Sequence, residues 1–144
     1  MAEPLPSDPG AYLLLIELTA PLALDIPRLG DATLAPGRYA YGGSAYGPGG
    51  LRARIGRHLR RDKPQRWHVD RLTGAGQVIG VRAHPGGWEC ALVRDLLQVP
   101  GVSVPLPGFG SSDCRACPAH LVMLPAEFEP GSLPGPISRA MGMG

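Results

Sequence analysis

Two kinds of spacing between apolar residues predict the secondary structure of this chain. Where every second side chain is apolar, as at Tyr12, Leu14 and Ile16, the residues share one face of a strand. Where apolar residues recur every four positions, as at Leu51 and Ile55, they share one face of a helix. The first spacing predicts strands at residues 12–18, 38–41, 77–83, 102–104 and 120–124, and the second predicts helices at residues 50–61, 67–72 and 87–98.

Prolines and glycines separate these segments. Residues 19–37 contain three prolines and are expected to form a long connection. The glycines that begin at Gly42 and Gly43 are expected to form a tight bend between a strand and the helix that follows. The N-terminal residues 1–9 are expected to be flexible, and the Pro/Gly/Met-rich residues 126–144 are expected to form a disordered tail.

Length and composition allow one domain of mixed helix and strand. The chain has 144 residues, of which 44% are apolar, and this is enough for a single core of modest size. Helical and strand-like segments follow one another without an internal repeat, so we expect one α+β domain over residues 10–125.

Positive charge is concentrated in one segment, although the net charge is only +2. Seven of the 14 Lys and Arg residues lie between Arg52 and Arg66, with Asp62 as the one acidic residue among them. A run of charge is usually a solvated surface, yet clustered arginine also suits contact with phosphates. The side chains expected to bind nucleic acid are Arg52, Arg57, Arg60, Arg61, Lys63 and Arg66.

Several classes of protein are disfavoured by what the sequence lacks. No apolar run approaches the ~18 residues of a membrane-spanning helix, and the N-terminus does not have the pattern of a signal peptide. The three cysteines are an odd number, which favours reduced thiols over a disulfide framework. A cytoplasmic protein that does not contact membranes is therefore expected.

Two residues occupy positions where their chemistry calls for a partner. His58 borders both the apolar stripe and the arginines of its helix, so it either hydrogen-bonds at the edge of the core or transfers protons at the rim of a site. A helical wheel places Glu89 near the centre of an apolar face, where an unpaired carboxylate is unfavourable. Glu89 is therefore expected to bind metal or act in catalysis, unless it serves the helix N-terminus or pairs with an arginine.

Cysteine and histidine residues give a weaker indication of a second site. Cys114, Cys117 and His120 have the spacing of zinc ligands, with Cys90 as a possible fourth donor. A single Cys-x-x-Cys pair is a weak signal, so reduced and partly buried thiols are favoured over zinc. His68 follows the basic helix, where it is either a capping or core residue or a second proton-transfer group.

Several of these positions match a known family. Residues 10–12 (Gly-Ala-Tyr) resemble its GIY element and residues 41–43 (Tyr-Gly-Gly) its YIG element, while Arg54, His58 and Glu89 fall where that family carries further site residues. The chain resembles the GIY-YIG nuclease superfamily and, more closely, its small stand-alone Uri-type branch. The closer resemblance rests on the segments at residues 37–45, 57–60, 67–70 and 107–114.

The resemblance implies a small central antiparallel sheet flanked by helices and metal-dependent hydrolysis of phosphodiester bonds. It implies that Tyr12 and Tyr41 lie side by side. It also implies that Tyr12 activates water, as a base or as part of a proton relay. Arg54 would stabilise charge in the transition state, and Glu89 would bind one Mg²⁺ or Mn²⁺ ion. The implied catalytic residues are Tyr12, Tyr41, Arg54, His58, His68 and Glu89.

The expected function is therefore a metal-dependent endonuclease acting on DNA, with low sequence selectivity or a preference for a DNA structure. RNA is a second possible substrate. The alternative is a non-catalytic nucleic-acid-binding module that uses the basic helix 50–61 and binds with a steep salt dependence. A third reading is a protein-interaction domain whose arginines are solvated surface.

Overall fold

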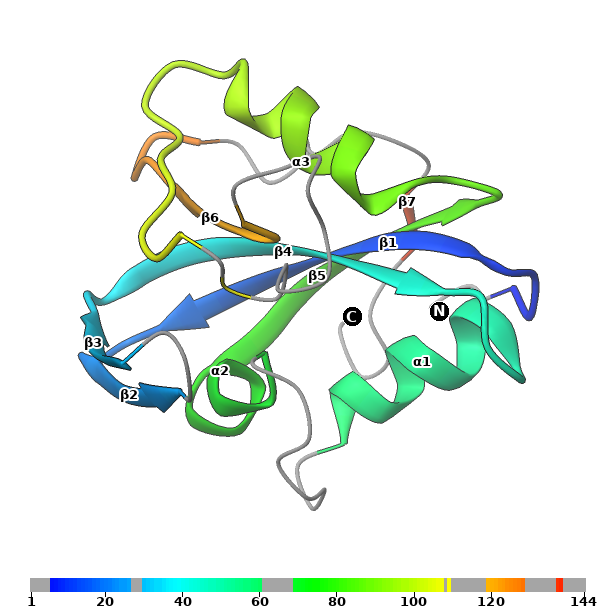
Figure 1. Cartoon of the computed structure of the whole chain (residues 1–144), viewed down its shortest axis with the longest axis horizontal. Coiled ribbons are helices and arrows are strands. Elements are labelled where there is room, and N and C mark those ends of the chain that lie inside the picture. The colour runs from blue at the N-terminus through cyan, green and yellow to red at the C-terminus, as the bar shows by residue number, and fades with distance from the viewer. Residues whose placement is uncertain are drawn as a thin grey trace.

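A five-stranded antiparallel sheet forms the centre of the molecule in the computed structural model, with helices on both of its faces (Figure 1). The expected α+β fold with a central antiparallel sheet is confirmed. The structure describes residues 6–26, 30–60, 69–107, 109, 119–128 and 137–138. The strands of this sheet are β1 (Gly10–Leu18), β4 (Gly37–Ala45), β5 (Gln77–Pro85), β6 (Leu121–Leu124) and β7 (Ile137–Ser138), and their order across it is β6-β4-β1-β5-β7.

The central strand β1 is buried on both faces, so its two sets of alternating side chains belong to two different cores. The even-numbered residues from Tyr12 to Leu18 pack toward α1 (Gly50–Leu59) and α2 (Asp70–Ala75). The odd-numbered residues from Ala11 to Leu15 pack toward α3 (Glu89–Leu97). Figure 1 shows α3 on one side of the sheet and α1 and α2 on the other. The pattern at residues 12–18 therefore predicted one of the two faces correctly.

The register between β1 and β4 brings the two expected site tyrosines together. Tyr12 lies opposite Gly43, and Leu14 lies opposite Tyr41. Opposed residues point to the same face of a sheet. Tyr12 and Tyr41 therefore project from neighbouring strands toward the face that α1 covers, as the resemblance implied.

The helices were located correctly, with shifts at their ends. The helix expected at residues 50–61 is α1 and ends at Leu59, with Arg60 as its C-cap. The short helix expected at residues 67–72 is shifted along the chain, because α2 runs from Asp70 to Ala75 and closes before Gly76. The helix expected at residues 87–98 is α3, and its N-cap is Trp88.

Three expectations about the β-structure were wrong. The connection expected at residues 19–37 contains a hairpin of β2 (Leu22–Ile26) and β3 (Gly30–Leu34), which pair antiparallel. The bend expected at Gly42 and Gly43 is instead part of β4, where both glycines keep extended pairing with β1. The strand expected at residues 102–104 is reduced to one bridge between Ser103 and Met123.

Both expected flexible ends contact the domain where the structure describes them. The carbonyls of Pro6 and Asp8 accept hydrogen bonds of 2.9 Å from the N–H groups of Arg52 and Leu51, which satisfies two donors in the first turn of α1. Residues 6–8 are therefore fixed at the helix. Phe128 is buried in the core on the α3 side, and β7 pairs with β5. The prediction of a disordered tail does not hold for these two segments.

Among the described residues, no helix has the length and apolar content that crossing a membrane requires.

Candidate active site

A buried hydrogen bond between Tyr12 and His58 forms the centre of the candidate site. The Tyr12 hydroxyl lies 2.6 Å from His58 Nε2, and the two side chains are 1% and 2% exposed. His58 lies three residues after Ile55 and seven after Leu51, so it shares the apolar face that packs α1 on the sheet. The sequence left open whether His58 is a core residue or a site residue. The structure places it in the core and against the expected site tyrosine at once.

Tyr41 and Arg54 complete this group from β4 and α1. The ring of Tyr41 lies 6.5 Å from that of Tyr12 and 6.1 Å from that of His58, measured between centroids. Arg54 Nη1 donates a 3.1 Å hydrogen bond to the carbonyl of Ser44, which orients the half-buried guanidinium along β4. Four of the six expected catalytic residues are therefore neighbours.

Burial is the largest influence on both phenols. It raises the pKa of Tyr12 well above the ordinary value, and the nearby Tyr41 and Asp70 raise it further, while the charge and hydrogen bond of Arg54 lower it. Burial likewise raises the pKa of Tyr41; Arg54 opposes this effect, whereas Asp70 and Glu89 reinforce it. The charge of Arg54 lowers both pKa values, but desolvation outweighs it.

The proton positions in this hydrogen bond depend on the tautomer of His58. The raised pKa of Tyr12 keeps its phenol protonated at neutral pH. A hydroxyl can donate to a ring nitrogen or accept from one, so His58 Nε2 accepts when the ring proton is on Nδ1 and donates when Nε2 itself carries the proton. The first of these arrangements links a weak acid to a base without a water molecule between them.

Asp70 belongs to the site although we did not assign it a role from the sequence. Its carboxylate accepts two hydrogen bonds from Arg57, of 2.9 Å and 3.0 Å, and its side chain is 1% exposed. This bidentate pair holds α2 against α1 beside the two tyrosines. The available signal was the segment Trp67-His68-Val69-Asp70, which contributed to the resemblance, but the spacing did not identify the partner of Asp70.

The absence of a side chain at Gly43 gives the Tyr12 ring its space. A Cβ atom at Gly43 would overlap the ring of Tyr12, including its hydroxyl. On the opposite face, a Cβ atom at Gly42 would lie 2.9 Å from Val93 Cγ2 in α3. The two glycines therefore let the tyrosine ring approach one face of β4 and α3 approach the other.

Glu89 lies at the rim of the site. The helical wheel had placed it at the centre of an apolar face, and the structure does not confirm this. Glu89 is the first residue of α3 and is only half-buried, whereas the next residue, Cys90, is fully buried. The Glu89 carboxylate is close enough to Tyr41 to raise the pKa of that phenol.

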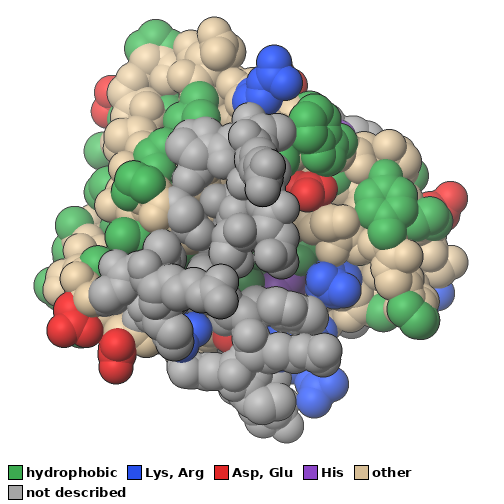
Figure 2. Space-filling view, in the orientation of Figure 1, with side chains coloured by type: hydrophobic (Ala, Val, Ile, Leu, Met, Phe, Trp, Pro, Cys, Tyr) green, Lys and Arg blue, Asp and Glu red, His purple; other side chains and the backbone are tan. Residues whose placement is uncertain are grey.

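The expected nucleic-acid-binding side chains differ in their surroundings. Arg52 on α1 and Arg60 at its C-cap are exposed, and Arg57 is paired with Asp70. In the space-filling view, arginine side chains lie beside a small visible patch of histidine (Figure 2). Arg61, Lys63 and Arg66 lie outside the described residues, as does His68.

The expected cysteine loop is described only in part. Cys114 and Cys117 lie outside the described residues. His120 is buried just before β6, and its Nε2 lies 3.4 Å from Sγ of Cys90 in α3. The sequence suggested Cys90 only as a possible fourth zinc donor. In the structure, Cys90 contacts His120 directly.

Comparison with known proteins gives one match. A family model described as "Domain of unknown function DUF123" matches residues 11–134. No curated protein and no solved structure matches the chain.

Proposed function

The chain belongs to the DUF123 family, whose description names no activity, and we propose that it is a metal-dependent endonuclease that hydrolyses phosphodiester bonds in DNA. The observation that carries the proposal is the buried Tyr12–His58 hydrogen bond with the Arg54 guanidinium beside it. A module that only binds nucleic acid needs exposed basic side chains. A phenol, an imidazole and a guanidinium gathered at one place are the groups that proton transfer and charge stabilisation require.

The resemblance to GIY-YIG nucleases supports the same conclusion. Tyr12, Tyr41, Arg54 and His58, which were carried over from the resemblance, come from β1, β4 and α1 and gather on one face of the sheet. Glu89, from α3 on the other side of the sheet, acts electrostatically on Tyr41.

Tyr12 and His58 are proposed to form a proton relay. Because the pKa of Tyr12 is raised, the phenol is not a preformed base at neutral pH. It would accept a proton from the attacking water while passing its own proton to His58 Nε2, so that the imidazole supplies the basicity. Tyr12 and His58 are nearly sealed from solvent, so a substrate would approach them past the half-buried Arg54 and Glu89.

Arg54 is proposed to stabilise the negative charge that develops on the phosphoryl oxygens. A fixed guanidinium in a site of low solvent content acts more strongly than one in water. Its hydrogen bond to the Ser44 carbonyl holds it in place before substrate binds. This pre-positioning leaves little rearrangement for the reaction itself.

Mg²⁺ or Mn²⁺ is the cofactor that the proposal implies, and Glu89 is the residue that would hold it. Carboxylate oxygen suits these hard cations, which commonly take one or two protein carboxylates together with waters and substrate phosphates. Glu89 is half-buried and lies within electrostatic reach of Tyr41, so its donor fits the group. When bound, the cation supplies Lewis-acid stabilisation of charge on the phosphate.

The test is cleavage of labelled DNA substrates by purified protein with Mg²⁺ or Mn²⁺. The panel includes duplex, single-stranded, flap and four-way-junction DNA, with the matching RNA single strand. We expect Glu89→Gln to reduce cleavage by at least about 100-fold, and Tyr12→Phe to reduce it by about 100-fold to 10,000-fold. Glu127→Gln is the matched control, because Glu127 is exposed and plays no part in the site.

The second candidate function is a nucleic-acid-binding module without catalysis. Exposed Arg52 on α1 and Arg60 at its C-cap favour it, and it predicts binding that weakens steeply with salt. Salt-sensitive binding without cleavage of any substrate would replace the nuclease with this module. Equal cleavage by wild type and Glu89→Gln would instead contradict the role of Glu89.

A further inference from the structure

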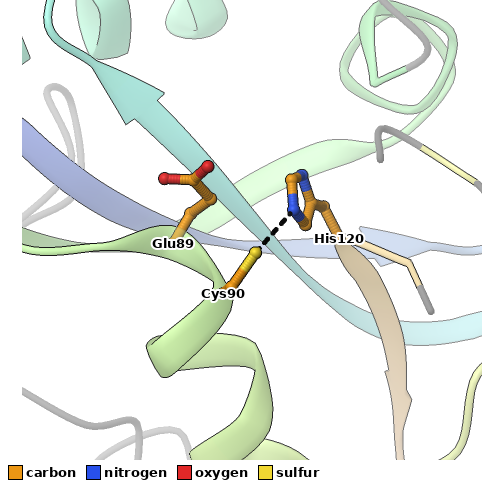
Figure 3. Close-up of side chains that lie close together, drawn as sticks. All are labelled: Glu89, Cys90 and His120. Atoms are coloured by element: carbon orange, nitrogen blue, oxygen red, sulfur yellow. Dashed lines mark hydrogen bonds between the residues drawn. The ribbon is translucent and has the colours of Figure 1, made fainter. Parts of the chain in front are cut away.

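Three side chains with different donor atoms meet at the start of α3, on the face of the sheet opposite the Tyr12–His58 pair. Glu89, Cys90 and His120 each offer one ligand atom, and these atoms all lie within 4.8 Å of one another. Figure 3 shows Glu89 and Cys90 at the first turn of the helix, with His120 facing them from the segment that leads into β6. We propose that these three residues bind a zinc-like divalent cation.

The distance between Cys90 and His120 fits two ligands of one tetrahedral ion. With Zn–S near 2.3 Å and Zn–N near 2.0 Å, the two ligand atoms of a tetrahedral site are separated by roughly 3.5 Å. The observed distance from Cys90 Sγ to His120 Nε2 is 3.4 Å. Only the Glu89 carboxylate has to approach, and as the first residue of α3 at a half-buried position it has the freedom to do so.

The backbone holds both buried donors in place. The carbonyl of His120 accepts a 2.8 Å hydrogen bond from the N–H of Gly42, and its N–H donates a 2.8 Å hydrogen bond to the carbonyl of Phe109. Gly42 lets the first turn of α3 lie directly against β4, since a Cβ atom there would be 3.4 Å from the carbonyl of Glu89. The sheet and the helix therefore fix the Cys90–His120 separation before any ion binds.

The donor set selects a borderline cation and not magnesium. Thiolate and imidazole are ligands that Zn²⁺ prefers, whereas Mg²⁺ takes oxygen. Cys90 is fully buried and His120 is 6% exposed, while Glu89 is half-buried. The sulfur and nitrogen thus lie on a dry side, and the carboxylate lies where a cation and a water molecule can enter.

This site does not depend on the proposed nuclease function, because its evidence is the donor set alone. The experiment therefore measures metal and not cleavage. Chelator-stripped full-length protein is titrated with Zn²⁺ against a chromophoric chelator, and Co²⁺ substitution is followed by absorption. We expect one tightly bound ion per chain and a thiolate-to-cobalt charge-transfer band.

The variants assign the ligands. Loss of a residue outside the ligand shell commonly reduces metal affinity by about 10- to 100-fold, so Cys90→Ser and His120→Ala should each reduce Zn²⁺ affinity by at least about 100-fold. His84→Ala and Glu127→Gln are the matched histidine and glutamate controls and should retain wild-type affinity. Circular dichroism of the metal-free proteins shows whether each variant is folded.

Three results would overturn the proposal. The first is the absence of tight Zn²⁺ binding by wild type. The second is unchanged Zn²⁺ affinity in a folded Cys90→Ser variant, which would mean that Zn²⁺ binds elsewhere in the protein. Should the variants fail to fold, anomalous diffraction at the zinc edge from wild-type crystals decides: a peak between Cys90 Sγ and His120 Nε2 supports the site, and a peak elsewhere rejects it.

Discussion

The protonation state of Tyr12 follows from where its phenol lies. Its hydroxyl is removed from water, and this raises the pKa more than the charge of Arg54 lowers it. The same balance holds for Tyr41. A tyrosine can then take part in proton transfer only together with a base, and His58 is in hydrogen-bonding contact. The resemblance left open whether Tyr12 acts as a base or as part of a relay, and its burial favours the relay.

At high pH, these raised values should make the folded protein less stable. The unfolded chain has tyrosines with the ordinary pKa of 10.0, while the folded protein keeps Tyr12 and Tyr41 protonated. The stability from this difference is fully present below pH 10.0 and is lost as the pH rises toward the raised folded pKa. Denaturant unfolding at about pH 8 and about pH 11 measures the loss. Between these two pH values, Tyr12→Phe should lose less stability than wild type. An equal loss would contradict the raised pKa of Tyr12.

Gly43 is the residue whose substitution should disturb Tyr12 most directly. In Gly43→Ala, the added methyl group would overlap the Tyr12 ring, and displacing that ring should destabilise the fold by about 1–3 kcal/mol. Gly80→Ala is the control, because a Cβ atom there would meet Leu15 at an ordinary 3.5 Å. Chemical denaturation of the two variants tests the difference. Similar free energies of unfolding would show that β4 can shift to accommodate a side chain at Gly43.

At the scale of elements, α1 and α2 are joined by charge. Arg57 and Asp70 form a bidentate ion pair whose side chains are 19% and 1% exposed. Asp70 also raises the pKa of both site tyrosines. The pair therefore fixes the helix that carries Arg54 and His58, and it contributes to the electrostatics of the site.

Breaking this pair should cost more than breaking a pair at the surface. Asp70→Asn leaves the Arg57 guanidinium without its carboxylate and should destabilise the protein by about 3–5 kcal/mol. Arg38 and Glu17 give the comparison, since their 3.5 Å contact joins side chains that are 36% and 39% exposed. Glu17→Gln should change the free energy of unfolding by less than about 1 kcal/mol. Thermal or denaturant unfolding of both variants measures the contrast, and equal effects would contradict it.

Considered as a whole, the molecule has two candidate sites on opposite faces of one sheet. Tyr12 and His58 lie on the face covered by α1, and Cys90 and His120 lie on the face covered by α3. Glu89, the first residue of α3, is within electrostatic reach of Tyr41, and its carboxylate lies within 4.8 Å of the ligand atoms of Cys90 and His120. One carboxylate could therefore serve either site.

This shared carboxylate predicts competition between two metals. Zn²⁺ held by Cys90 and His120 would engage Glu89, so Zn²⁺ added in slight excess over protein should lower the Mg²⁺-dependent cleavage of DNA. Cys90→Ser retains Glu89 and should need at least about 10-fold more Zn²⁺ for half-inhibition. Cleavage at a series of Zn²⁺ concentrations measures the effect. Inhibition of both proteins at the same concentration would show that Zn²⁺ acts elsewhere.

Local patterns allowed a large part of the fold to be predicted. The alternation in β1 and the four-residue spacing in α1 each reflect a regular element packed against a core, so the elements could be read from short segments. Prolines in residues 19–37 obscured the hairpin, although Leu22, Leu24 and Ile26 alternate in the manner of a strand. Gly42 and Gly43 were predicted to form a bend, but they belong to β4. The reason for glycine there is the close packing of Tyr12 and Val93, which the sequence does not reveal.

The sequence by itself determined most of the helices and strands and the residue types of the site. This is because periodicity, charge and short motifs involve only a few neighbouring residues. The tertiary structure decided which of those residues meet. Tyr12 and His58 are 46 positions apart and Cys90 and His120 are 30 apart, so their contacts depend on sheet register and on the packing of helices across it. Burial, which sets the pKa of both tyrosines, likewise exists only once the chain has folded.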